Sequence, residues 1–157
     1  MRSLFQSILA PVKFLAHYRL FQRREGQMNS LQIILWWEAR RLLFNIVVGT
    51  AGLITVCAML FSAMIAEKLV NEPIAWPDPP LFAIIGVALY AIAANVCYTG
   101  GWLAELISRE VWGDKARGFG EISFTLGIIF SFLLTLLPGA LAVIAVLSRF
   151  IFMQLMK

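Results

Sequence analysis

Side chains that could act as nucleophiles, proton donors or metal ligands are few in this sequence and do not cluster. His17 is the only histidine, and the two cysteines, Cys57 and Cys97, lie far apart in the chain. This set is too small and too dispersed to supply the ligands of a zinc site. No serine lies in a G-x-S-x-G motif, and the glycine patterns that bind phosphates or dinucleotides do not occur. We therefore expect no catalytic residue, no metal site and no cofactor, and a protein that is not an enzyme.

The carboxylates that could take part in chemistry stand beside basic residues. Glu105 and Arg109 are four positions apart, a spacing that predicts a local ion pair on one helix. Glu38 lies close to Arg40 and Arg41, which allows two interpretations. The arginines could grip the phosphate of a lipid headgroup, or they could simply anchor the chain at the positively charged side of a membrane. Of the two, plain anchoring is favoured.

Uncharged polar residues interrupt an apolar stretch at residues 93–104, AANVCYTGGWLA. Asn95 and Thr99 share a helix face, and Gly100 and Gly101 follow directly. These residues could line a transport path, hold helices together or merely be tolerated. A transport site favours ionisable residues and a helix broken near the bilayer midplane, whereas this stretch is uncharged and its glycines lie near one end. We therefore expect Asn95 to hydrogen-bond to a neighbouring helix, with the glycines allowing a close approach.

Small residues recur at every fourth position between residues 123 and 139. The members of this stripe are Ser123, Gly127, Ser131, Thr135 and Gly139. Such spacing predicts a groove in which another helix backbone can approach closely, from the same chain or from another one. Pro138 within the stripe predicts a kink, because neighbouring helices can satisfy the carbonyl that a proline leaves free; a turn between two short crossings is the alternative.

The elements that carry these residues are predicted from composition. Of the 157 residues, 61% are hydrophobic and 14% are charged, against about 45–50% and about 25% in soluble domains. Three runs without any charge, Leu42–Ala66, Pro79–Ala104 and Ile122–Ser148, contain 25, 26 and 27 residues, and about 20 helical residues cross a bilayer core. The sequence therefore predicts an all-α integral membrane protein. Its three transmembrane helices are expected at about 42–66, 81–104 and 122–148, in a single transmembrane domain, 42–157.

Residues 1–41 are predicted to form a basic arm at the membrane surface. Apolar residues recur at helical spacing between Leu4 and Ala16, which predicts an N-terminal amphipathic interfacial helix. Asn29 or Ser30 is expected to cap a second helix that runs directly into the first span. The predicted membrane-surface residues are Arg19, Arg23, Arg24, Arg40 and Arg41.

The distribution of charge predicts the orientation. Arginine is concentrated before Leu42, whereas the loop 67–80 contains one lysine against three acidic residues. Positive charge prefers the cytoplasmic side, so the N-terminus and the loop 105–121 are expected in the cytoplasm of a bacterial inner membrane. The loop 67–80 and the C-terminus are expected on the outside. Topology accounts for the basic residues, and nucleic-acid binding is therefore not expected.

The function predicted from these features is non-catalytic. Helix–helix packing would make the chain a structural, assembly or accessory subunit, with the lipid bilayer and other membrane proteins or further copies of itself as partners. The alternative is a small channel or transporter formed by oligomerisation, in which polar faces of several chains line a path.

Overall fold

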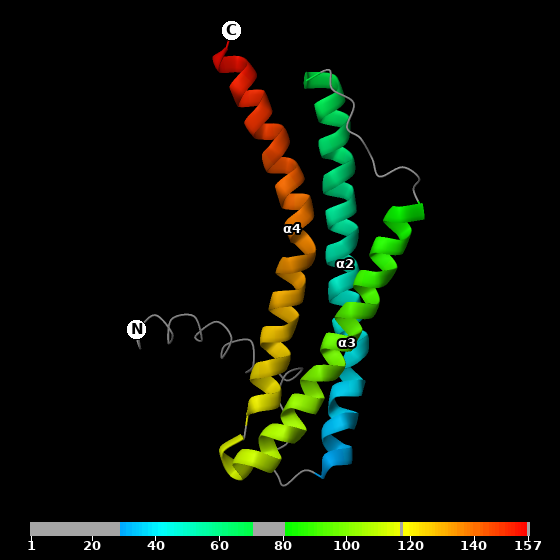
Figure 1. Ribbon diagram of the computed structural model, residues 1–157, viewed down its shortest axis with the longest axis vertical. Coiled ribbons are helices and arrows are strands. Elements are labelled where there is room, and N and C mark those ends of the chain that lie inside the picture. The colour runs from blue at the N-terminus through cyan, green and yellow to red at the C-terminus, as the bar shows by residue number, and fades with distance from the viewer. Residues whose placement is uncertain (1–28, 71–80, 117, 157) are drawn as a thin grey trace. The chain divides into compact units, whose positions relative to one another are not determined.

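The computed structural model describes residues 29–70, 81–116 and 118–156, and within these ranges the chain is all-helical (Figure 1). The α-helices are α2 (Ser30–Val70), α3 (Leu81–Trp112) and α4 (Phe119–Leu155), and a short 3₁₀ helix, η1 (Gly113–Ala116), follows α3. The all-α prediction is confirmed for the described residues. The amphipathic helix predicted between Leu4 and Ala16 lies outside them, as does the loop 71–80.

Each α-helix contains a segment that is long and apolar enough to cross a membrane. These segments are Ser30–Lys68, Ile84–Trp112 and Phe119–Leu155, and each contains an 18-residue stretch with a mean hydropathy of 2.2, 1.5 and 2.5, respectively. All three helices extend beyond the charge-free runs of the sequence, because charged residues near their ends are included in the helical hydrogen-bonding pattern. The predicted number and approximate positions of the apolar helices are therefore confirmed, and their lengths are greater than predicted.

The start of α2 is fixed by a reciprocal cap. The backbone N–H groups of Gln32 and Ile33 donate to the carbonyl of Asn29, and the side chain of Gln32 accepts a hydrogen bond of 3.1 Å from the Asn29 N–H. This exchange satisfies backbone groups that the first helical turn would otherwise leave unpaired. The prediction that a helix begins at Asn29 or Ser30 and runs into the first apolar segment is confirmed.

Two glycines with positive φ delimit the connection between α3 and α4. Gly113, directly after α3, has φ 53°, and Gly118, directly before α4, has φ 82°. Residues with a Cβ seldom adopt this left-handed region, so glycine is the natural residue at both positions. Gly113 thus ends α3 in the way that is common at helix C-termini.

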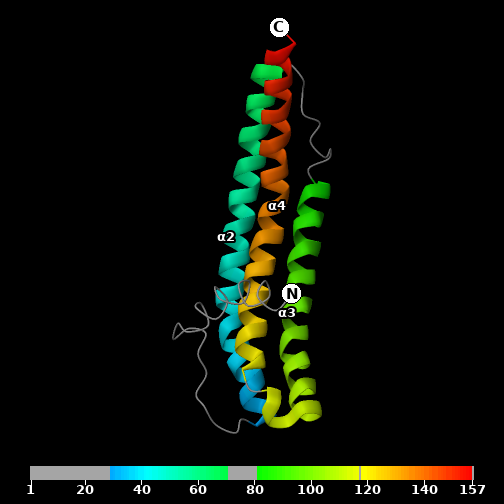
Figure 2. The same cartoon turned by 90° about the vertical axis from the view of Figure 1, so that its left-hand side faces the viewer.

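Close contacts divide the chain into two compact units. Among the described residues, the first combines 29–44 with 93–116 and 118–130, and the second combines 45–70 and 81–92 with 131–156. In the first unit, the beginning of α2, the end of α3 and the beginning of α4 lie side by side in both Figure 1 and Figure 2. The second unit is made from the remaining parts of the same three helices.

Aromatic rings form the core of the first unit. Trp36 and Trp37 of α2 both lie against Phe124 of α4, with ring centroids 5.6 Å apart in each case. Tyr98 of α3 contacts Trp37 at 5.4 Å and Phe44 at 4.7 Å. Most of these pairs meet edge to face, the arrangement that the ring quadrupoles favour. All five side chains are buried, so this cluster joins the three helices to one another.

Hydroxyl groups and one glycine connect α4 to α2 and α3 in the second unit. The buried Thr55 hydroxyl donates to the carbonyl of Thr135 at 2.6 Å, and the Tyr90 hydroxyl lies 2.6 Å from the Thr135 hydroxyl. A Cβ atom added to Gly139 would lie only 3.1 Å from the Cα of Thr55. Glycine therefore permits the close backbone approach that small residues were predicted to provide. The helix continues through Pro138, as expected for a kink rather than a turn.

Candidate functional site

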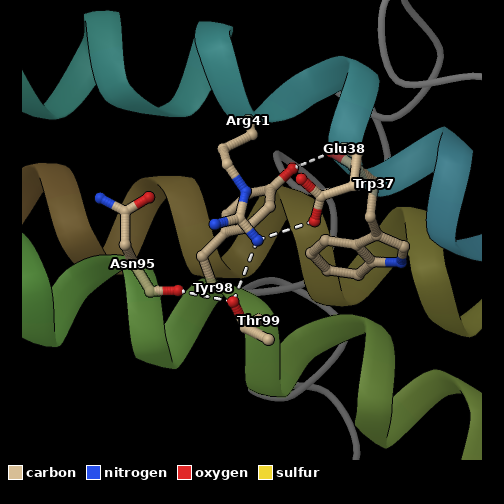
Figure 3. A network of polar contacts seen from close by, with 6 residues as sticks. All are labelled: Trp37, Glu38, Arg41, Asn95, Tyr98 and Thr99. Atoms are coloured by element: carbon tan, nitrogen blue, oxygen red, sulfur yellow. Dashed lines mark hydrogen bonds and ion pairs between the residues drawn. The ribbon is translucent and has the colours of Figure 1, made fainter.

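Polar side chains of α2 and α3 form a connected network in the first unit (Figure 3). Arg41 donates through Nη2 to the Glu38 carboxylate at 2.7 Å and to the Thr99 hydroxyl at 3.0 Å. Thr99 in turn donates to the backbone carbonyl of Asn95 at 2.9 Å. The guanidinium of Arg41 also lies over the Tyr98 ring, 5.3 Å from its centroid. Arg41 thus joins α2 to α3 through a hydroxyl and an aromatic face, while Glu38 of its own helix orients the guanidinium.

The network continues into the interior through Trp37. The hydroxyl of Tyr98 donates to the Trp37 carbonyl, and the indole Nε1 of Trp37 donates to the Glu105 carboxylate at 2.8 Å. Glu105 has no exposed surface, and it also accepts from Arg109 Nε at 3.0 Å. Because a buried carboxylate is costly unless it is paired and hydrogen-bonded, these two donors account for its presence in the core.

Two glycines provide the space for these side chains. A Cβ atom on Gly101 would lie 2.6 Å from the ring of Trp37, and one on Gly120 would lie 2.7 Å from the carboxyl carbon of Glu105. The neighbouring Gly100, in contrast, has nothing within 4 Å of its virtual Cβ. Only the second residue of the pair therefore serves the close approach predicted for both.

Arg40 points to a different neighbour from Arg41. Its guanidinium carbon lies 4.0 Å from the centroid of the Trp36 ring, and its Nη1 donates to the Trp36 carbonyl at 3.1 Å. An arginine stacked on an indole is held in a defined position by a cation–π interaction. The two adjacent arginines, both predicted to lie at the membrane surface, thus have different contacts.

Only some of the predicted packing residues contact another helix of the described chain. Thr99, Thr135 and Gly139 contact other helices, as described above. Ser131 contributes a carbonyl that accepts the Thr135 hydroxyl within α4, and Ser123 is half-buried. Gly127 has open space around it. A bond from the Asn95 side chain to a neighbouring helix remains a prediction, and Arg19, Arg23 and Arg24 lie outside the described residues.

Trp37, Tyr98 and the cross-helix role of Glu105 were not predicted from the sequence. The local pair between Glu105 and Arg109 was predicted and is confirmed. The available signal for the rest was the spacing of Tyr98, Gly101 and Glu105, which places all three on one face of α3. That spacing indicates a shared neighbour but does not identify it.

The chemistry available to this network is hydrogen bonding and charge pairing. Within the described ranges, no group of three or more His, Cys, Asp or Glu residues is arranged to hold a metal ion. Cys57 and Cys97 are exposed free thiols. The bonds from Arg41 to Thr99, from Tyr98 to Trp37 and from Trp37 to Glu105 join α2 to α3, which makes the network a packing site.

Comparisons with known proteins add no assignment: no protein-family model, no curated protein and no solved structure matches the chain.

Proposed function

We propose that this chain is a membrane-spanning structural or accessory subunit that acts through helix packing and carries out no catalysis. The observation that carries this proposal is that buried polar side chains form hydrogen bonds between helices of the same chain. Thr55, Trp37 and Tyr98 each donate to an acceptor on another helix of the same chain. Because hydrocarbon offers no hydrogen-bonding partners, such internal bonds favour a membrane location.

The outward-facing apolar side chains support the same proposal. Large hydrophobic residues are exposed along all three helices, for example Leu53 (67%), Ile84 (66%) and Phe130 (66%). Exposed apolar surface on this scale is typical of a surface that meets lipid or another protein. Lipid and neighbouring transmembrane helices would cover it in a membrane subunit.

The orientation we propose follows the charge distribution. The arginines before Leu42 favour a cytoplasmic N-terminus in a bacterial inner membrane. Residues 105–121, which include the connection between α3 and α4, would then lie on the cytoplasmic side, and residues 67–80 would lie on the opposite side. The packing network of the first unit would then lie at the cytoplasmic boundary.

The proposed function is tested by measuring how substitutions in the small-residue stripe 123–139 of α4 affect assembly. Gly127 is exposed, and a Cβ atom added there has no atom of the described chain within 4 Å, so this position of α4 is open to a second helix. We expect Gly127→Ile or Ser131→Ile to reduce the detergent-stable assembled species, because a branched side chain holds two helix backbones apart. Ile128→Leu and Phe130→Leu are the controls. The measurements are size-exclusion chromatography and co-purification in mild detergent, and equal yields from all four variants would contradict the proposed interface.

An oligomeric channel or transporter is the second candidate. It is favoured by the half-buried positions of Asn95 and Thr99, two polar residues on one face of α3. If these residues serve packing, Asn95→Leu lowers stability or oligomer yield modestly, and any ion flux in reconstituted liposomes is retained. A variant that assembles normally but loses flux would assign Asn95 to a path and support the channel.

A further inference from the structure

Nε of Arg41, on α2, and Nε1 of Trp102, on α3, are buried nitrogen atoms of the first unit that have no hydrogen-bond partner among the residues that the structure describes. A buried N–H group without a partner is unfavourable, and each such group in a folded protein calls for an explanation such as a bound ligand. Arg41 makes its protein contacts through Nη2, and these leave Nε unused.

Helix geometry puts Trp102 beside the part of α3 that Arg41 contacts. Arg41 lies over the ring of Tyr98 and bonds to Thr99. On a helix, position 102 lies one turn beyond positions 98 and 99 and between them around the axis. Helical side chains lean towards the N-terminus, so a residue at 102 covers the turn that carries Tyr98 and Thr99. Trp102 therefore lies on the face of α3 that Arg41 approaches.

The positions of Arg41 and Trp102 at the ends of charge-free runs indicate which ligands could reach them. Arg41 is the last charged residue before the charge-free run Leu42–Ala66, and Trp102 lies two positions before the end of the run Pro79–Ala104. If the helices span a bilayer, as proposed above, both residues lie where the hydrocarbon meets the headgroups, a level at which tryptophan is enriched. The groups present there in quantity are lipid phosphates.

The chemistry of the two donors fits a phosphate. A guanidinium presents several N–H groups in a planar fork that matches phosphate oxygens, which an ammonium group cannot reproduce. Glu38, the present anionic partner of Arg41, is 41% exposed, so its ion pair is weak and the carboxylate can turn to water. We propose that Arg41 and Trp102 bind the phosphate group of an anionic phospholipid.

The test compares variants that separate specific donors from total charge. The purified protein in mild detergent is offered phosphatidylglycerol and phosphatidylcholine, and bound lipids are counted by native mass spectrometry. Arg41→Lys retains the charge but should lower the preference for phosphatidylglycerol roughly ten-fold, as expected for the loss of one charge-assisted hydrogen bond. Trp102→Phe removes a neutral donor and should lower it roughly three-fold.

Two controls complete the design. Lys115→Ala removes an exposed positive charge, and Arg40→Lys changes the neighbouring arginine that stacks on Trp36; both should retain the preference. If Lys115→Ala lowers it as much as Arg41→Lys, or Trp102→Phe has no effect, the site is wrong and general attraction by charge explains the binding. Such a result would leave the proposed subunit function standing, because assembly is measured separately.

Competition with inorganic phosphate shows whether the bound phosphate group belongs to a lipid or is a free ion. With a lipid headgroup as the ligand, millimolar phosphate should not displace phosphatidylglycerol, since the lipid is also held by its chains. Binding of inorganic phosphate to the lipid-free protein, with the same sensitivity to Arg41→Lys, would retain the phosphate chemistry and overturn the lipid as its source.

Discussion

Glu105 combines a fully buried carboxylate with two donors from different parts of the chain, Trp37 and Arg109. Glu105→Ala would leave the buried indole N–H of Trp37 without its acceptor, which costs about 1–3 kcal/mol. It would also remove the ion pair of the partly exposed Arg109. We expect a clear fall in the thermal unfolding temperature, followed by tryptophan fluorescence. Glu105→Gln, which retains an acceptor for the indole, should cause a smaller fall. The exposed neighbour Glu110 provides the control, and a fall as large for Glu110→Ala would show that the buried bonds are unimportant.

The pair Gly100-Gly101 allows a test at adjacent positions. A methyl group at 101 would overlap the ring of Trp37, whereas one at 100 meets open space. Since Trp37 is held on several sides, the ring cannot move without breaking other contacts, and overpacking of this kind costs about 1–3 kcal/mol. We expect Gly101→Ala to lower the free energy of unfolding in detergent and Gly100→Ala to leave it unchanged or slightly higher. The opposite order would contradict the packing described for the first unit.

At the scale of a helix, a hydroxyl of α2 bonds to α4 in the turn that Pro138 disturbs. Pro138 has no N–H to bond the carbonyl one turn earlier, and its ring disturbs that turn. The carbonyl of Thr135 lies in the same turn and accepts the hydroxyl of Thr55 from α2. Side chains of neighbouring helices commonly satisfy backbone groups that a proline has loosened.

This arrangement predicts coupling between the two positions. Thr55→Val retains the shape of the side chain and removes the donor, and it should cost about 0.6–2 kcal/mol of unfolding free energy. In a Pro138→Ala background the regular helix bond is restored, so the same substitution should cost less. A double-mutant cycle in detergent measures the difference. Strictly additive effects would indicate that the Thr55 bond is unrelated to the proline.

At the scale of the whole molecule, the main prediction is the orientation in the membrane. Single cysteines replacing Asp78 and Lys115, in a background without Cys57 and Cys97, should react with an impermeant thiol reagent from opposite sides. The reason is the difference in charge: the residues before Leu42 carry an excess of arginine, whereas residues 67–80 carry more acidic than basic residues. Reaction of both positions from one side would exclude three crossings with this orientation.

Local sequence patterns predicted the features that depend on one helix at a time. The start of α2 at Asn29–Ser30, the pair of Glu105 with Arg109 and the apolar segments are of this kind, because capping and four-residue spacing are properties of a short window. The contact of Trp37 with Glu105 is different in kind. It depends on how two helices are rotated about their axes, and no window of either helix contains that information.

The contacts of the small-residue stripe likewise depend on how two helices are arranged, which no local sequence pattern contains. Gly127 and Gly139 are equivalent in spacing, yet Gly139 lies against the Thr55 backbone and Gly127 meets open space. A repeat of four identifies a face of α4 but not how far along that face a neighbour stays close. That distance is set by the angle at which two helices cross.

The beginning of α2 has a mechanical consequence. The twelve residues 30–41 are helical and contain no glycine or proline, so they extend the helix by about 18 Å before the charge-free run begins. A helix without such residues has no built-in hinge there. A force or torque that an attached partner applies to these first turns would therefore reach the start of the apolar segment with little bending of residues 30–41.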